Sequence, residues 1–469
     1  MHKNALQKLS RFLNAAVLVL VSAQILTGLV WGFLNCITLQ NFPDTAELVK
    51  LSGTLNLRGD TGIVYPALLI VVRALTAYGI VRFYHVMYLI QIVLAFIAWS
   101  VFGKNVLGID GKRKNAFFAL AVVTNPFPMQ VHLAVLEYSF ISSFLCLLVS
   151  FQIRFAHEWR NAENSLGLER ALRDVSVTSL FWLLTALTRK EFIIIGFIPV
   201  LALLITVVKS LVKNKAAATA VLWPVIVTLA FAGIICMGDS LFREGERISA
   251  ADVVKRSLYY RVAWSENFRD RYHWPEYLTE FTDEGMMTHI MNDPGLVRTE
   301  YTEYVVDIYG SKTTTDLFYK WAKESFSGNK RQIVKDIISD MAGYIFAPLK
   351  TEMVLCGVGN SGFAAGNYDI MRQHNPCLTK VYLRYFSILY TVFAVIGIAV
   401  LAIKTAKTDE AERRIKTSLY MPAVLMVLCM AVCYTFMGCN MFDHRKVVFV
   451  TCLWMTMGTL LFCHQTNEN

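Results

Sequence analysis

Two acidic side chains lie where a carboxylate could take part in chemistry. Asp44 follows the first long apolar run, in "NFPDTAELVK", and Glu137 lies inside a later one, in "VHLAVLEYSF". A positioned carboxylate can accept a proton from an attacking hydroxyl group, so both residues are candidates for general-base catalysis. Asp44 also has the spacing of a capping box, with Glu47 three residues later. The local sequence therefore leaves helix cap and catalyst open for Asp44.

Glu137 is placed by the sequence about one turn inside the outer end of an apolar helix. A carboxylate at that depth is costly unless it faces protein or water, which indicates a functional acid. An internal hydrogen bond to a neighbouring helix is the alternative, and the sequence does not separate the two. His132, close by, is interpreted as a polar residue near the membrane interface.

Basic side chains mark two short turns between apolar runs. Arg189 and Lys190 lie in "LTALTRKEF", and His444 and Arg445 lie in "MFDHRKVVFV". Arginine and lysine at a membrane surface are well suited to holding a phosphate group. The structural alternative is a solvated hairpin tip.

The composition of the chain indicates a membrane protein. Of the 469 residues, 55% are hydrophobic and 17% are charged, whereas soluble domains carry about 25% charged residues. The net charge of +10 does not indicate nucleic-acid binding, because the basic residues cluster in short loops between apolar runs. The ten cysteines form no CxxC pair, and a disulfide between Cys356 and Cys377 is left open. No cofactor is assigned; a divalent metal held by Asp44 and Glu137 stays open but is not favoured.

Apolar runs of roughly 20 residues predict about ten transmembrane helices. They lie near residues 12–34, 82–103, 115–129, 133–152, 175–188, 191–208, 216–238, 382–404, 417–438 and 446–463. The basic loops place both termini in the cytoplasm and the large loops outside the plasma membrane. The apolar run 62–79 contains Arg73 and would invert this topology if it crossed, so we expect a helix lying on the outer surface.

The predicted fold is an all-α polytopic integral membrane protein with external juxtamembrane helices and a mostly helical external domain. Residues 1–240 form an N-terminal seven-helix module with a long first external loop (35–81). Residues 241–380 form an external cap, in which 331–349 has helical periodicity, and residues 381–469 form a three-helix membrane segment.

Four stretches resemble the polytopic GT-C glycosyltransferases. "PDTAELVKLSGTLNLRGDTGIVYPALL" matches that family's first external loop, with Asp44 at its essential acid and Tyr65-Pro66 at the dipeptide opening its second juxtamembrane helix. "NPFPMQVHLAVLEYSF" is similar to the second external loop, where Glu137 matches a second acid. "LTALTRKEFIIIGFIPVLALL" resembles the family's "LTRPEG"-type turn through Arg189, and "DHRKVVFV" its late "RY" turn.

The resemblance covers the first 240 residues, and the last 100 more loosely, with two departures. Thr45 follows Asp44 where a second acid is usual, and Lys190 stands where proline is usual. These departures concern the choice of subfamily.

The resemblance implies an inverting transfer of a sugar from a polyprenyl-phosphate donor to a cell-envelope glycan or glycolipid at the outer membrane face. Asp44 would be the general base, with Glu137 as a second catalytic acid. The residues expected to hold the donor phosphate are Arg58, Arg189, Lys190 and Arg445, and those expected to line the substrate pocket are Glu47, Tyr65, His132 and His444. Two alternatives remain: a lipid or polysaccharide transporter or flippase, and a non-catalytic membrane protein that presents residues 239–380 to partners.

Overall fold

The computed structural model describes most of the N-terminal half and two later stretches of the chain. The described residues are 2–35, 48–49, 62–77, 79–160, 165–189, 223–234, 309–345 and 376–386, with isolated positions between and beyond these ranges. Within them the regular structure is helical and includes no β-strand, which confirms the predicted all-α class for this part of the chain.

The chain divides into two compact units. One unit contains Met1–Phe242, Ala347–Val427 and His444–Asn469, and the other contains Arg243–Phe346 and Leu428–Asp443. The predicted domain limits at residues 240 and 380 stay predictions.

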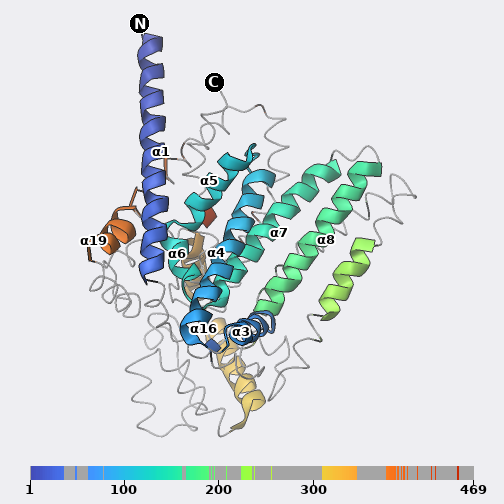
Figure 1. Cartoon of the computed structure of the whole chain (residues 1–469). Coiled ribbons are helices and arrows are strands. Elements are labelled where there is room, and N and C mark those ends of the chain that lie inside the picture. Colours follow the sequence, from blue (N-terminus) through green and yellow to red (C-terminus); the bar gives the residue numbers. More distant parts are fainter. Residues whose placement is uncertain are drawn as a thin grey trace. The chain divides into compact units, whose positions relative to one another are not determined.

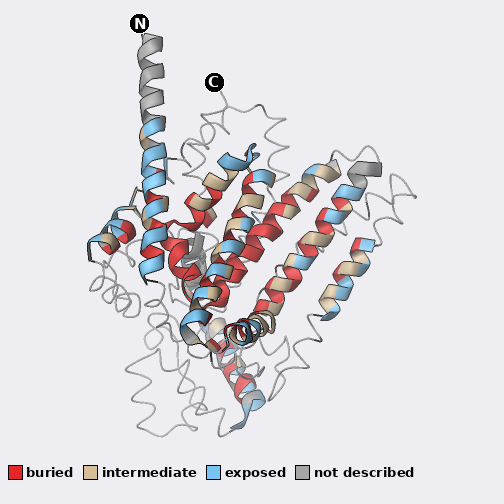
Figure 2. Cartoon of the chain, viewed as in Figure 1, coloured by how far each residue is buried: buried red, intermediate tan, exposed pale blue. Residues whose placement is uncertain are grey.

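The described helices of the first unit include a group of neighbouring helices, drawn in blue to green in Figure 1. They are α1 (His2–Asn35), α3 (Val64–Leu75), α4 (Ile80–Asn105), α5 (Lys112–Val123), α6 (Pro126–His132), α7 (Glu137–Arg160) and α8 (Ser165–Thr188), followed later by α19 (Pro376–Thr379) and the π-helix η4 (Lys380–Phe386). Among these elements, α7 makes its most extensive contacts with α8 and then with α4. Figure 2 shows that α7 is buried along most of its length.

The second unit contains the long helix α16 (Ser311–Ile345). The sequence predicted helical periodicity over 331–349; the helix is confirmed as far as Ile345 and begins earlier, at Ser311. Lys255 Nζ lies 2.5 Å from Asp316 Oδ1 in this helix.

Two of the described helices are long and apolar enough to cross a membrane, Val81–Asn105 and Glu137–Trp159. Large apolar side chains also lie exposed on α1 and α4, among them Leu26, Phe33 and Leu89. Figure 2 shows exposed positions along both helices. Contact with lipid would explain this exposure, because exposing an apolar side chain to hydrocarbon carries no free-energy cost of hydration. The ten-span arrangement remains a prediction.

Helix α3 covers most of the apolar run that the sequence placed on the surface. Its 12 residues extend about 18 Å, which is shorter than the roughly 30 Å of hydrocarbon in a bilayer. Arg73 lies in its last turn and donates from Nη1 to the carbonyl of Val49 at 3.2 Å. The length and this contact fit a helix that does not cross the membrane.

The predicted continuous span 115–129 is wrong. Helix α5 ends at Val123 and α6 begins at Pro126, with Asn125 between them as the N-cap, accepting a hydrogen bond from Phe127 N at 3.1 Å. Proline is favoured at the first position of a helix and ends the one before it, so "TNPFP" carried a signal that apolar content concealed.

The neighbouring boundaries also differ from the prediction. The span expected at 133–152 begins only at Glu137, because residues 133–136 form a buried turn. The span expected at 175–188 ends as predicted, but α8 begins at Ser165. Glu137 is therefore the first residue of α7 and not a residue one turn inside a helix.

The break between α5 and α6 is stabilised by two other segments. The carbonyl of Thr124 accepts hydrogen bonds from Gln24 Nε2 on α1 and from the Tyr382 hydroxyl on η4, each at 2.5 Å. The rings of Trp31 and Tyr382 lie 4.9 Å apart, and Trp31 Nε1 donates to Thr379 Oγ1 at 3.3 Å. A carbonyl freed at a helix end thus finds protein donors, as an apolar environment requires.

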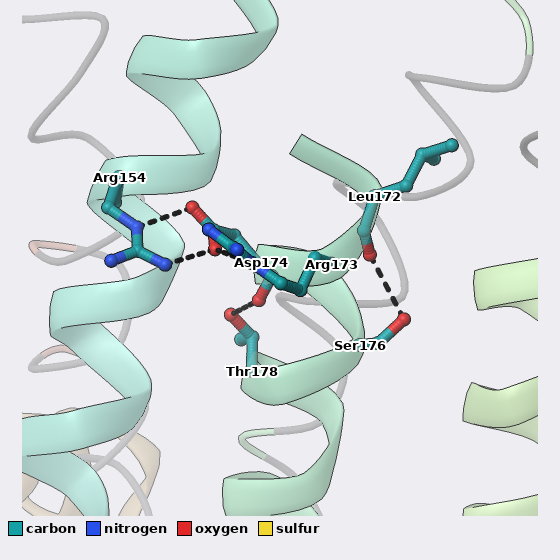
Figure 3. Close-up of polar contacts among 6 residues, drawn as sticks. All are labelled: Arg154, Leu172, Arg173, Asp174, Ser176 and Thr178. Carbon is teal, nitrogen blue, oxygen red and sulfur yellow. Dashed lines mark hydrogen bonds and ion pairs between the residues drawn. The ribbon is translucent and has the colours of Figure 1, made fainter. Parts of the chain in front are cut away.

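Helices α7 and α8 form a pair that is joined near the connection between them by an ion pair. Arg154 Nε donates to Asp174 Oδ2 at 2.5 Å, and its Nη2 donates to Oδ1 (Figure 3). The Asp174 side chain has no exposed surface, and that of Arg154 is 29% exposed. Such a two-point contact matches the planar fork of a guanidinium to the two oxygens of a carboxylate.

Many hydroxyl side chains are buried in α7 and α8. Ser143 and Ser150 donate to the carbonyls four residues earlier in α7, and Thr178 and Ser179 do so in α8. This internal bonding satisfies each hydroxyl group within its own helix, and Ser179 Oγ also lies 2.7 Å from Thr228 Oγ1 in the helical residues 223–234.

Candidate functional site

Several buried polar side chains meet at the end of the first unit where α7 begins and α8 ends. We call this set the polar cluster, and its members are Tyr65, Gln91, His132, Glu137, Ser139 and Arg189. Four of the six were predicted as site residues from the sequence: Tyr65, His132, Glu137 and Arg189. They come from four separate segments, α3, α6, α7 and the residue after α8.

An ion pair between Glu137 and Arg189 forms the charged part of the cluster. Arg189 Nη1 lies 2.7 Å from Glu137 Oε1, and their side chains are 16% and 4% exposed, respectively. The Arg189 guanidinium also lies over the ring of Tyr138, 5.1 Å from its centroid. Glu137 lies at a helix N-terminus and Arg189 at a helix C-terminus, so each charge complements the dipole of its own helix.

The sequence left Glu137 open between a functional acid and an internal hydrogen bond. The structure shows the internal bond through Oε1, whereas Oε2 is buried and has no hydrogen-bond partner among the described residues. A buried oxygen without a partner costs about 1–3 kcal/mol, so this position favours an additional donor. The catalytic role of Glu137 stays a prediction.

Tyr65 and Gln91 hold the turn that precedes Glu137. The Tyr65 hydroxyl donates to Gln91 Oε1 at 2.9 Å, and Gln91 Nε2 donates to the carbonyls of His132 and Ala134 at 2.6 and 2.8 Å. Burial, the charge of Glu137 and then Tyr88 raise the pKa of Tyr65 well above its usual range, so the hydroxyl keeps its proton. Through Gln91, the Tyr65 hydroxyl therefore stabilises the backbone of the turn before Glu137.

His132 is fully buried at the end of α6 and does not lie at an exposed interface. Its Nδ1 lies 2.8 Å from Ser139 Oγ, and its Nε2 has no hydrogen-bond partner in the described part of the chain. Burial lowers the pKa of His132 to about 3. The imidazole is thus neutral at physiological pH and does not supply a cation for phosphate binding.

Gly62, within the first predicted external loop and just before α3, lies against the end of α8. Its N–H donates to the carbonyl of Thr188 at 2.8 Å, next to Arg189. A Cβ added at Gly62 would lie 2.0 Å from the Leu187 carbonyl oxygen, so only glycine allows this backbone approach. The crossing fixes where the loop enters the polar cluster.

Replacing Gly62 by alanine is expected to destabilise the protein by about 1–3 kcal/mol, because the backbone of α8 cannot move aside for the methyl group. Thermal unfolding of the detergent-solubilised protein measures the effect. Gly233→Ala is the matched control, since an added Cβ there meets nothing within 4 Å among the described residues. Equal unfolding temperatures for the two variants would show that the crossing is not tight.

The other predicted site residues lie outside the described residues. They are Asp44, Glu47, Arg58, Lys190, His444 and Arg445. Gln91 and Ser139 were not among the site residues predicted from the sequence. Gln91 stands inside the apolar run "YLIQIVLAF", and an amide at that depth indicates an internal partner, so a signal was present.

In the described part of the chain, no group of three or more His, Cys, Asp or Glu residues lies together in a way that could hold a metal ion. Cys377 is a free, exposed thiol. Cys356, with which the sequence left a disulfide open, lies outside the described residues. Cys146 and Cys452 are buried free thiols, in line with packing roles.

Comparisons with protein-family models, with curated proteins and with solved structures gave no match to this chain. The polar cluster is therefore interpreted from its own geometry and from the sequence motifs.

Proposed function

We propose that this protein is a membrane glycosyltransferase that moves a sugar from a polyprenyl-phosphate donor to a cell-envelope glycan or glycolipid. The observation that carries the proposal is the buried Glu137–Arg189 pair. It lies at one end of the α7–α8 pair, beside Gly62, which belongs to the same predicted external loop (35–81) as Asp44. Three of the GT-C-like stretches contribute residues to the polar cluster, Tyr65, Glu137 and Arg189.

In the proposed reaction, Asp44 takes the proton of an acceptor hydroxyl, which attacks the anomeric carbon with inversion. The bond from that carbon to the phosphate oxygen breaks, and the polyprenyl phosphate leaves with the negative charge. Cations aligned in advance stabilise that charge, and such stabilisation often lowers the barrier more than any other effect. Arg58, Arg189, Lys190 and Arg445 are the proposed cations.

The geometry refines the proposed roles of Glu137 and Arg189. A guanidinium has five N–H donors in a planar fork, so an arginine oriented by one carboxylate can bind a phosphate through its other edges. Glu137 and the ring of Tyr138 both contact the Arg189 guanidinium. We therefore assign Glu137 the orientation of Arg189, with its Oε2 available to a substrate hydroxyl.

The proposal includes a plasma-membrane location, about ten spans, cytoplasmic termini and an outward-facing polar cluster. The exposed apolar side chains of α1 and α4 and the two helices able to cross a membrane support the membrane setting. The proposed partners are the polyprenyl-phosphate sugar, the acceptor and the bilayer, and nucleic acid is not among them. No cofactor is assigned.

A lipid or polysaccharide transporter is the second candidate, and one observation favours it. The break between α5 and α6 and the π-helix η4 are discontinuities of the kind that transporters use at their binding sites. The charged residues of the polar cluster, however, lie at helix ends and not at the middle of the helices.

An assay in lipid nanodiscs and in sealed vesicles tests the two candidates. The purified protein is supplied with a polyprenyl-phosphate sugar, radiolabelled in the sugar, and with a crude glycolipid acceptor fraction. If the protein is a glycosyltransferase, we expect labelled glycolipid and released polyprenyl phosphate in nanodiscs. Movement of the labelled lipid across vesicles without any glycosylated product would favour the transporter, and mass spectrometry of copurified lipid would identify the natural donor.

A further inference from the structure

Helices α7 and α8 carry two ion pairs that define the same alignment of the helices. Residues that face each other across an antiparallel helix pair lie at matching distances from the connection. Position 163 lies in the connection between the two helices. Glu137 and Arg189 each lie 26 residues from it, and Arg154 and Asp174 lie 9 and 11 residues from it, respectively. A shift of one helix by a turn, about 5.4 Å, would break both pairs together.

The two ion pairs lie far apart along the helices. At 1.5 Å per residue, Glu137 and Arg154 are separated by about 25 Å along α7. Both acids are almost fully buried, with 4% of the Glu137 side chain and none of the Asp174 side chain exposed. Neither acid can exchange its arginine for water without moving the helix.

Between the two ion pairs, the other contacts of α7 with α8 are less specific for one alignment of the helices. They include the aromatic rings of Phe144 and Phe151 on either side of Phe181, with centroid distances of 6.3 and 5.9 Å. The buried hydroxyls of Ser143, Ser150 and Ser179 bond to carbonyls of their own helices, and Ser179 bonds also to Thr228, which belongs to neither α7 nor α8. Apolar and small side chains of this kind can pack in more than one register, whereas buried polar pairs are best attested as devices that select one.

We infer that the Arg154–Asp174 pair selects the register of α7 and α8 and thereby places Arg189 beside Glu137. Arg154 and Asp174 are positioning residues that act about 25 Å from the polar cluster. The selection of register does not depend on the proposed function, and only its consequence for sugar transfer rests on that function. Neither residue was among the predicted site residues, and both lie between the predicted spans 133–152 and 175–188.

Cross-linking measures the register directly and needs no catalytic activity. In a background without native cysteines, Glu137→Cys is combined with Arg189→Cys (in register) or with Thr185→Cys (one turn out of register). A short bifunctional thiol reagent joins the pairs, and mass spectrometry gives the ratio of in-register to out-of-register product. The Glu137–Arg189 pair is absent in these variants, so the measured ratio reports the effect of the Arg154–Asp174 pair alone.

Replacing Arg154 and Asp174 together by Met and Leu is expected to lower that ratio by about tenfold, within the range of coupling between contacting residues. A pair that served stability alone would leave the ratio unchanged, because apolar replacement of a buried ion pair often preserves stability. An unchanged ratio in the Met/Leu variant would overturn the inference.

The reversed pair, Arg154→Asp with Asp174→Arg, keeps the inference testable if the apolar variant fails to insert. It should retain more in-register product than Arg154→Asp alone, although Glu158 and Arg173 then lie beside like charges. Equal loss of in-register product in the Arg154→Asp variant and in the reversed pair would also overturn the inference. Loss of sugar transfer with an intact register would instead concern the proposed function.

Discussion

Replacing Asp44 by asparagine is expected to lower the rate of sugar transfer by about 10²–10⁴-fold, the usual contribution of a general base. Asparagine caps a helix about as well as aspartate, so this change removes the base and keeps the cap. The protein should therefore insert and unfold like the unmodified chain. The measurement is release of polyprenyl phosphate in nanodiscs, together with thermal unfolding in detergent.

The controls separate the two roles that the sequence left open for Asp44. Asp44→Ala removes cap and base together and should add a stability loss of about 1 kcal/mol to the same loss of rate. Asp60 lies in "RGDTG", a sequence typical of a turn, so Asp60→Asn should keep the rate. If Asp44→Asn transfers sugar normally while Asp44→Ala is only less stable, Asp44 is a helix cap and the proposed base is wrong.

Replacing Arg154 alone by methionine is expected to lower the free energy of unfolding by about 3–5 kcal/mol, because the buried Asp174 carboxylate loses its partner. The Arg154 side chain covers Asp174 at two points, and Asp174 itself has no exposed surface. Changing both residues, to Met and Leu, should restore most of this loss. Unfolding in detergent across the four proteins of the double-mutant cycle gives the coupling energy.

Arg173 supplies a matched control next to the same carboxylate. Its Nε lies 3.6 Å from Asp174 Oδ1, and its side chain is 64% exposed. An exposed contact of this kind is worth about 0–1 kcal/mol, so Arg173→Met should unfold nearly as the unmodified protein does. Similar losses for Arg154→Met and Arg173→Met would mean that Asp174 finds other compensation.

The sequence predicts helices well where the signal is local. The span expected at 82–103 is α4, which begins at Ile80 and ends at Asn105. The prediction of a span at 115–129 was wrong. Hydropathy measures the cost of taking side chains out of water and carries no information on whether the helix continues. Pro126 and the Asn125 cap decide that question. The extra turn before Glu137 was hidden for the same reason, since its residues are apolar.

The candidate site was predicted in part. Tyr65, His132, Glu137 and Arg189 were named from residue type, depth and motif, and all four lie in the polar cluster. Their partners were not predictable in the same way. Gln91 is one amide in an apolar run, and only the meeting of α3, α4 and the turn before α7 shows that it bonds to Tyr65 and to the backbone of that turn.

The amino-acid sequence is enough to predict the helical class of the described residues, the apolar faces and the charged residues near helix ends, because length and hydrophobicity are properties of each segment alone. Which charges pair depends on the fold. Glu137 and Arg189 are 52 residues apart, and Arg154 and Asp174 are 20. Each acid meets its arginine only in one register of α7 and α8, and that register depends on how two complete helices pack together.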